Sequence, residues 1–178
     1  WPGDWGQTDM VSAGVIWQKM IVDDKAGILY TLTASTSYNV DKGLLPGPNL
    51  FTSGAIALNA KTGELIWYYA ADPHSISVNA DCGWGATLAN VKVGGQEKAA
   101  VIAPCKGKNQ IFTLDAQSGK PLLPPVEIGL VFNGDPNAGK GNDADMYARQ
   151  KVGMVCPGHL GGIEAHIAFA YNTIFAPV

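Results

Sequence analysis

The stretch IALNAKTGEL at residues 56–65 returns as FTLDAQSGKP at residues 112–121. Three positions of the two copies are identical, and Asn59/Asp115 and Thr62/Ser118 are chemically close. Each copy is an apolar run that ends in a polar turn, in which Asn or Asp caps the turn and Gly supplies a positive φ. A repeat of this size built from antiparallel strands is typical of β-propeller blades.

Further short apolar runs bounded by turn residues continue the pattern along the chain. We expect strands at residues 28–34, at 55–58 with 64–69, at 99–103 with 110–114, and at 167–171 with 174–176. No window keeps a long amphipathic helical period, so the predicted fold class is all-β. Residues 132–151 (FNGDPNAGKGNDADMYARQK) are rich in Gly, Asn and Asp, and they predict a long exposed loop.

The length limits how much of a propeller the chain can form. At about 40–50 residues per blade, 178 residues hold three to four blades, and the long loop favours three. Three blades do not close a ring, and an open ring leaves sheet edges unpaired. We therefore predict that residues 1–178 are one partial propeller domain whose partners are the remaining blades. Trp1 does not begin a signal peptide, so we expect a removed leader or a start within the protein.

The composition excludes several classes of protein. Apolar residues make up 47% and charged residues 15%, which is too apolar for a disordered chain. The net charge is −3 and Arg149 is the only arginine, so a nucleic-acid partner is not expected. No apolar run approaches the roughly 20 residues that span a bilayer.

The three cysteines match neither a CxxC nor a zinc-binding spacing. They are either buried free thiols or include a disulfide between Cys82 and Cys105, which would close a loop of roughly twenty residues. Cys82 precedes the turn at residues 83–85 and Cys105 ends the next predicted strand, so adjacent strands would bring them together. A disulfide would indicate an oxidising compartment, and Cys156 would then have no partner within the chain.

Several motifs resemble those of the pyrroloquinoline quinone (PQQ) alcohol dehydrogenases. Residues 46–69 and the following Pro73-His74 are similar to that family's P-G-D-N-L-Y, A-L-D-x-x-T-G-x-x-x-W and P-H-D-x-W-D motifs. Residues 1–4, 108–115 and 156–162 also resemble the corresponding parts of the family. The resemblance covers most of the chain in the right order. It implies part of an eight-bladed propeller of four-stranded sheets. It also implies a periplasmic or extracellular enzyme that oxidises an alcohol by hydride transfer to the quinone and passes electrons to an acceptor.

The resemblance also implies residues that contact the cofactor. The family's chemistry needs an indole stacked under the quinone, a cation at its oxygens, a metal ion and a carboxylate base. Trp17 falls at the position of the stacking tryptophan, Lys108 at that of the cation, and Glu164 at that of a cofactor-contacting asparagine. Taken alone, Trp17 would equally suit blade packing, and Lys108 would suit a solvated turn.

The metal and base positions depart from the family pattern. Ser35 stands where the family has a metal-ligating asparagine, and Val78 stands where it has the catalytic aspartate. Ala80 replaces the extra carboxylate of lanthanide-using members. Asp81 would act as the base only if the register slips by one residue. We therefore expect no calcium or lanthanide ligated by Ser35 or Val78, and weak or absent PQQ binding.

Two functions remain open from the sequence. The first is a PQQ-dependent alcohol dehydrogenase, and the second is a non-catalytic propeller that serves as a structural or interaction subunit. His74 is expected to be a corner histidine bonded to the backbone. His159 and His166 flank Glu164, but β-structure does not require them to converge on a metal.

Overall fold

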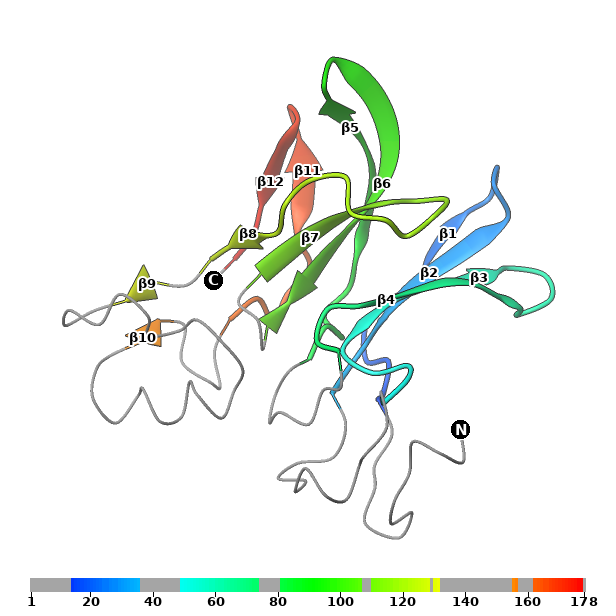
Figure 1. Ribbon diagram of the computed structural model, residues 1–178, viewed down its shortest axis with the longest axis horizontal. Coiled ribbons are helices and arrows are strands. Elements are labelled where there is room, and N and C mark those ends of the chain that lie inside the picture. Colours follow the sequence, from blue (N-terminus) through cyan, green and yellow to red (C-terminus); the bar gives the residue numbers. More distant parts are fainter. Residues whose placement is uncertain are drawn as a thin grey trace, which may run out of the picture.

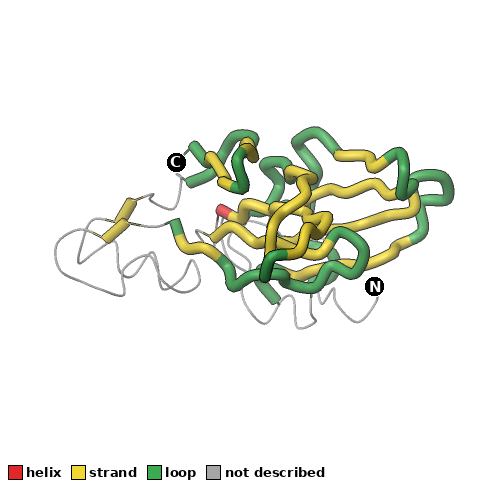
Figure 2. Tube along the Cα trace, turned by 90° about the horizontal axis from the view of Figure 1, so that it is seen from above, coloured by secondary structure: helices red, strands yellow, loops and turns green. Residues whose placement is uncertain are grey.

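The computed structural model describes residues 14–35, 49–73, 81–106, 110–128, 130–131, 155–156 and 162–177 (Figure 1). Strands make up half of this part of the chain (Figure 2), and none of its secondary-structure elements is an α-helix. The all-β prediction is therefore confirmed. No helix formed by these residues is long and apolar enough to cross a membrane. The predicted loop at 132–151 lies outside the described residues.

Two four-stranded antiparallel sheets dominate the structure, and in both the strands pair in chain order. The first sheet contains β1 (Ile21–Asp23), β2 (Ile28–Thr33), β3 (Gly54–Asn59) and β4 (Leu65–Ala70). The second contains β5 (Thr87–Val93), β6 (Gln96–Cys105), β7 (Gln110–Asp115) and β8 (Val126–Glu127). Each sheet is the four-stranded unit expected of one propeller blade.

Two short antiparallel pairs complete the described strands. They are β9 (Leu130–Val131) with β10 (Val155–Cys156), and β11 (Ala168–Ala170) with β12 (Thr173–Phe175). The β11–β12 hairpin is attached to β5, because Thr87 Oγ1 donates a hydrogen bond to the Ile167 carbonyl at 2.9 Å. The predicted strand pairs are confirmed, whereas β1, β5, β8, β9 and β10 were not predicted.

The three polar turns of the sheets share one hydrogen-bonding arrangement. Asn59 Oδ1 accepts bonds from the backbone N–H groups two and three residues later, and Asp115 Oδ1 does the same at 3.1 and 2.8 Å. Gly63 and Gly119 close these turns with φ of 74° and 69°. The turn that Asp23 begins between β1 and β2 is built in the same way and ends at Gly27 with φ of 69°. The repeat that the sequence predicted therefore reflects a real structural repeat, and its turn has a third copy of the same length at residues 23–27.

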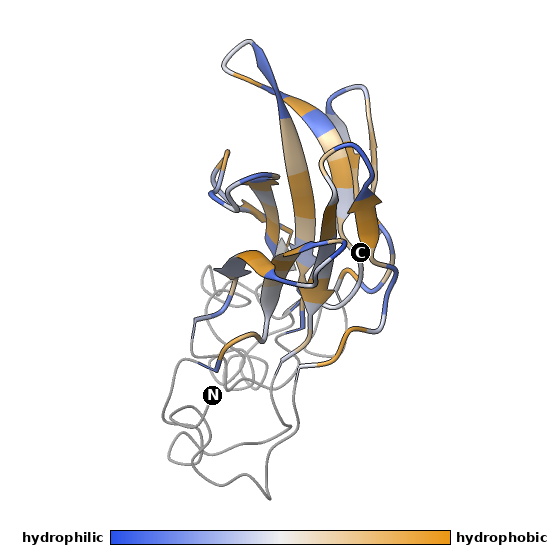
Figure 3. Ribbon diagram, turned by 90° about the vertical axis from the view of Figure 1, so that its right-hand side faces the viewer, coloured by the Kyte–Doolittle hydropathy of each residue, from blue (hydrophilic) through white to orange (hydrophobic). Residues whose placement is uncertain are grey.

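The hydrophobic core lies on both faces of the second sheet. On β6, Val101 and Ala103 join the cluster that includes Tyr30 and Leu32 of the first sheet. Ile102 is directed to the other face and packs in a second cluster with Ile111, Ile163 and Ile167. Alternate residues of a strand point to opposite faces, so the second part of β6, from Ala100 to Cys105, is buried by apolar contacts on each side. Figure 3 shows the apolar residues following the strands, with hydrophilic residues at several turns.

Trp67 on β4 joins the first sheet to the second. Its Nε1 donates a hydrogen bond of 3.0 Å to the backbone carbonyl of Ala116, in the turn after β7. Its ring lies so close to Gly119 that a Cβ on this glycine would be 2.7 Å from the indole. The turn that carries the sequence repeat is therefore also the surface on which the neighbouring blade packs.

A candidate cofactor-facing site

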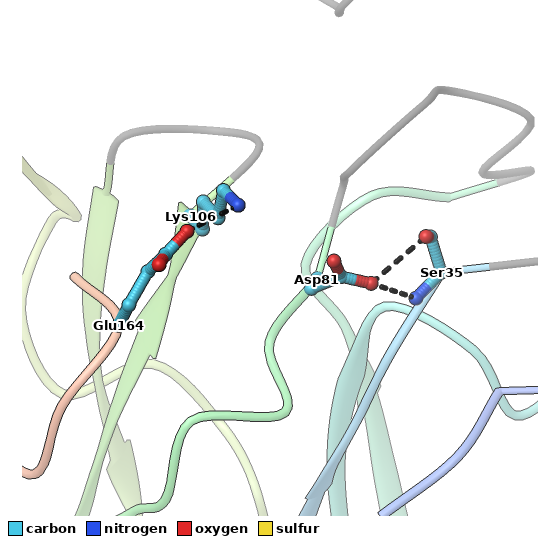
Figure 4. A network of polar contacts seen from close by, with 4 residues as sticks. All are labelled: Ser35, Asp81, Lys106 and Glu164. Carbon is cyan, nitrogen blue, oxygen red and sulfur yellow. Dashed lines mark hydrogen bonds and ion pairs between the residues drawn. The ribbon is translucent and has the colours of Figure 1, made fainter. Parts of the chain in front are cut away.

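A buried carboxylate lies where β2 ends. The backbone nitrogen and the hydroxyl of Ser35 both donate hydrogen bonds to Oδ1 of Asp81, at 2.8 and 2.9 Å (Figure 4). Asp81 is only 4% exposed. Two donors on one oxygen fix the orientation of the carboxylate, and they offset the cost of burying a charged group.

A disulfide joins the cysteine that follows Asp81 to the cysteine at the end of β6. Cys82 and Cys105 form a disulfide with a Cα–Cα distance of 4.1 Å, so the disulfide is the correct one of the two alternatives that the sequence left open. Next to it, the backbone N–H of Lys106 donates a hydrogen bond of 2.8 Å to the Asp81 carbonyl. The end of β6 and the loop before β5 are therefore held together by a covalent bond and a hydrogen bond.

An ion pair with one buried and one exposed partner joins the end of β6 to the segment before β11. Lys106 Nζ lies 2.5 Å from Oε1 of Glu164 (Figure 4). The Lys106 side chain is 7% exposed and that of Glu164 is 40% exposed. A buried ammonium group needs a partner, and Glu164 supplies it. The family position that the sequence assigned to Glu164 thus carries a carboxylate directed at a lysine.

Lys106 is a site residue that the sequence analysis did not identify. We assigned the cation to Lys108, which lies outside the described residues. A signal was present, because Lys106 directly follows the apolar run at residues 99–105 and therefore ends a buried strand. A lysine is almost never buried unless it is paired, so a lysine at the end of a buried strand is a candidate for an ion pair.

Two tryptophans form an aromatic wall beside the ion pair. The ring centroids of Trp17 and Trp84 are 5.1 Å apart with an interplanar angle of 31°, and Lys106 Nζ lies 5.9 Å from the Trp84 ring. Trp17 is 47% exposed, so much of its indole surface is open to a ligand. A Cβ on Gly83 would lie 2.3 Å from Trp17 Nε1, which shows how closely the loop backbone approaches the indole.

The Trp84 indole has a buried polar atom. Its Nε1 is buried and has no hydrogen-bond partner among the residues that the structure describes. A donor left in this state costs free energy, about 1–3 kcal/mol, so an acceptor brought by a ligand or by another part of the protein would stabilise it. The wall therefore combines an exposed aromatic surface with an unused donor.

Tyr68 of β4 and the backbone of Ser53 hold the chain segments next to Ser35. Tyr68 donates a hydrogen bond of 2.5 Å from its hydroxyl to the Thr52 carbonyl, and Ser53 N–H donates to the Ala34 carbonyl at 2.8 Å. Burial, followed by the negative charge of Asp72, raises the pKa of Tyr68 well above its ordinary value. Tyr68 therefore stays protonated and serves as a donor, not as a base.

These residues fit a flat anionic quinone better than they fit a metal ion. An indole surface, a lysine ammonium and a fixed carboxylate match the stacking, charge-stabilising and proton-accepting groups that PQQ chemistry requires. Calcium takes six to eight oxygen ligands, whereas the described part of the chain holds no group of three His, Cys, Asp or Glu side chains suited to a metal. The carboxylates of this site that could bind calcium are Asp81 and Glu164, and Glu164 is already paired with Lys106.

Of the remaining residues singled out from the sequence, the structure describes only His166 and the backbone of Cys156. His74, Val78, Ala80 and His159 lie outside the described residues. The His166 ring lies against Gly85, where an added Cβ would be 2.5 Å from its Cε1 and Nδ1. The backbone of Cys156 pairs with Leu130 in the β9–β10 ladder, and the structure does not test a partner for its thiol.

Known proteins provide the context for this geometry. A family model described as the PQQ glucose/ethanol/alcohol dehydrogenase β-propeller domain matches residues 1–135. The large subunit of glycerol dehydrogenase from Gluconobacter oxydans is 33% identical over 128 residues, which are 68% of this chain and 17% of that protein. The quinoprotein glucose dehydrogenase of Escherichia coli is 32% identical over 112 residues, which are 62% of this chain and 14% of that protein.

A solved structure supports the fold independently. The quinohemoprotein alcohol dehydrogenase ADHIIG from Pseudomonas putida superposes with a TM-score of 0.71 and 23% identity, over 90% of this chain and 25% of that protein. The chain thus spans about a quarter or less of the length of these relatives, and it is a part of such a propeller. Because the family match extends through residue 135 of 178, the chain belongs to the PQQ family of glucose/ethanol/alcohol dehydrogenase β-propeller domains.

Proposed function

We propose that this chain supplies part of the cofactor-facing surface of an extracytoplasmic PQQ-dependent alcohol dehydrogenase. One observation carries the proposal: Trp17, Trp84, Lys106, Asp81 and Ser35 form one unbroken series of contacts at the ends of β2 and β6. The series brings together an indole surface, a cation and a carboxylate, which are the groups that quinone-dependent alcohol oxidation needs.

Each residue has a role that follows from its environment. Bound PQQ would supply an electrophilic quinone carbonyl that accepts a hydride from the alcohol carbon. Trp17 binds the flat ring system on its exposed indole surface. Lys106, in place of or together with Lys108, stabilises negative charge on the quinone oxygens. Asp81 accepts the hydroxyl proton of the alcohol, while the two Ser35 bonds keep its carboxylate in position.

The proposal also includes a location and partners. A structural disulfide persists in oxidising compartments, so the Cys82–Cys105 bond supports a periplasmic or extracellular site of action. The further blades of the propeller would complete the pocket, and an electron acceptor would reoxidise the reduced quinone. A calcium or lanthanide ion would need ligands beyond Asp81 and Glu164, so the test includes both kinds of metal.

The test is to assay alcohol-dependent dye reduction by the complete protein, with PQQ and calcium and then with PQQ and a lanthanide. We expect turnover with at least one metal, a loss of about 10²–10⁴-fold in Asp81→Asn, and weakened PQQ binding in Trp17→Ala. Asp24→Asn is the matched control, because Asp24 is an exposed aspartate of the β1–β2 turn. No turnover with either metal, together with an unchanged melting temperature on adding PQQ, would favour the non-catalytic scaffold instead.

A further inference from the structure

The Cys82–Cys105 disulfide lies directly between the two charged residues of the site. Asp81 precedes Cys82 and Lys106 follows Cys105, so each charged residue is covalently bonded to one half of the cystine. The two cysteines are 1% and 2% exposed, and Asp81 and Lys106 are 4% and 6% exposed. The covalent cross-link and both charged groups are therefore buried together.

Backbone hydrogen bonds around the cross-link join the residues that carry the two charged side chains. The Lys106 N–H bonds to the Asp81 carbonyl at 2.8 Å, and the Cys82 N–H bonds to the Thr33 carbonyl at 3.2 Å, two residues before Ser35. Ser35 in turn holds the Asp81 carboxylate. The loop that carries Asp81 is thus tied to the end of β2 on one side and to the end of β6 on the other.

We infer that the Cys82–Cys105 disulfide is a positioning element of the site, which sets the distance between the Asp81 carboxylate and the Lys106 ammonium. The identity of the ligand in this inference rests on the proposed function. The positioning of Asp81 and Lys106 by the disulfide does not depend on it. Groups that act on one ligand must be held within a fraction of an ångström, and short loops do not achieve this without support. Asp81 lies in the loop before β5 and Lys106 directly follows β6, and the disulfide supplies that support to both.

A purely stabilising disulfide and a positioning disulfide predict different results. If the disulfide only stabilises the fold, removing it lowers the melting temperature and affects the site no more than an equally destabilising substitution elsewhere. If the disulfide positions the site residues, removing it disturbs the site more than such a substitution does. Val91→Ala is the matched control, because Val91 is 5% exposed in the cluster on the other face of β6 and is not one of the residues that the contacts of the site join.

The experiment compares the complete protein with its Cys82→Ala/Cys105→Ala and Val91→Ala variants, well below the melting temperature of each. The first measurement is the hydrogen exchange rate of the Lys106 amide without cofactor. The second is PQQ affinity in the presence of calcium, followed by quenching of tryptophan fluorescence. We expect the double variant to exchange the Lys106 amide about tenfold faster and to bind PQQ about tenfold more weakly or worse, with little change in Val91→Ala.

The outcomes separate this inference from the proposed function. Unchanged Lys106 exchange in the double variant, or equal losses in Val91→Ala, would overturn the positioning role. If the unaltered protein does not bind PQQ, the proposed function fails, whereas faster Lys106 exchange in the double variant would still support the positioning role. If the Cys82→Ala/Cys105→Ala variant does not fold, Cys82→Ala/Cys105→Val takes its place in both measurements, because valine fills the volume of one lost sulfur.

Discussion

The Trp67 indole and the Ala116 carbonyl form a 3.0 Å hydrogen bond between residues 49 positions apart in the chain. The bond connects β4 of the first sheet to the turn after β7 of the second. Trp67 is 8% exposed, so the donor and acceptor are removed from water and depend on each other. The contact between the two sheets is therefore specific as well as apolar.

Replacing Trp67 should cost more than replacing Trp84. Trp67→Phe leaves the Ala116 carbonyl without its donor, and we expect a loss of about 1–3 kcal/mol in the free energy of unfolding beyond the effect of the smaller ring. Trp84→Phe makes the same change in volume but removes a donor that has no partner among the described residues. Urea denaturation of both variants measures the difference. Equal losses would contradict the role of the Trp67 bond.

The two repeated turns offer a second matched pair of substitutions. Gly63 and Gly119 have nearly the same positive φ, so alanine strains each backbone by a similar amount, about 1–2 kcal/mol. A Cβ at Gly63 meets nothing within 4 Å in the described structure, whereas one at Gly119 lies 2.7 Å from the Trp67 ring. We expect Gly119→Ala to lower the free energy of unfolding further than Gly63→Ala, by an additional amount of about 1–3 kcal/mol, which denaturation of both variants measures. An equal effect would mean that the sheets do not pack as described.

Asp115 should make stability depend on pH in the acid range. Burial alone would raise the pKa of its carboxyl, but hydrogen bonds from Ser118 and Gln117 and the charge of Lys98 outweigh this and lower the pKa. Because the folded pKa is below the unfolded one, the stabilisation is complete above the unfolded pKa and is lost as pH falls through the folded one.

Asp115→Asn removes this titration, and asparagine already performs the same capping role at position 59. We expect the unaltered protein to lose more stability than Asp115→Asn between about pH 6 and about pH 3. Melting temperatures recorded across this range provide the test. Parallel curves for the two proteins would show that the turn does not favour the charged carboxylate.

The Lys106–Glu164 pair should show energetic coupling. Glu164→Gln leaves the buried ammonium with a neutral partner, and we expect a loss of about 1–2 kcal/mol, less than for a fully buried pair because Glu164 is 40% exposed. Lys106→Met/Glu164→Gln should cost less than the sum of its single variants, with a coupling energy above about 0.5 kcal/mol. Strict additivity in denaturation experiments would contradict the ion pair.

The sequence was most informative where local chemistry determines the structure. The turns begun by Asn59 and Asp115 could be predicted because a side-chain cap and a glycine at a fixed spacing specify them. By contrast, β5 was not predicted, since its sequence TLANVKV mixes polar and apolar residues and its burial depends on neighbours distant in sequence.

The site was harder to predict than the turns. The pairing of Ser35 with Asp81 and of Lys106 with Glu164 joins residues 46 and 58 positions apart, so no local pattern encodes it. The family resemblance drew attention to Trp17, Lys108 and Glu164, yet the lysine that contacts Glu164 is Lys106. The cysteine spacing likewise left the disulfide open, because spacing does not specify how two side chains are oriented.

The strict chain order of the strands has a consequence for how the protein folds. Each strand of the two sheets pairs with its immediate neighbour in sequence, so most backbone contacts close short loops of the chain. Folding rates rise as the average sequence separation of contacts falls. The strand pairings within each blade would therefore form before the contacts that join the two blades. The slower steps would be docking of Trp67 on the next blade, which joins residues 49 positions apart, and oxidation of the cysteines, which is slow as a chemical step.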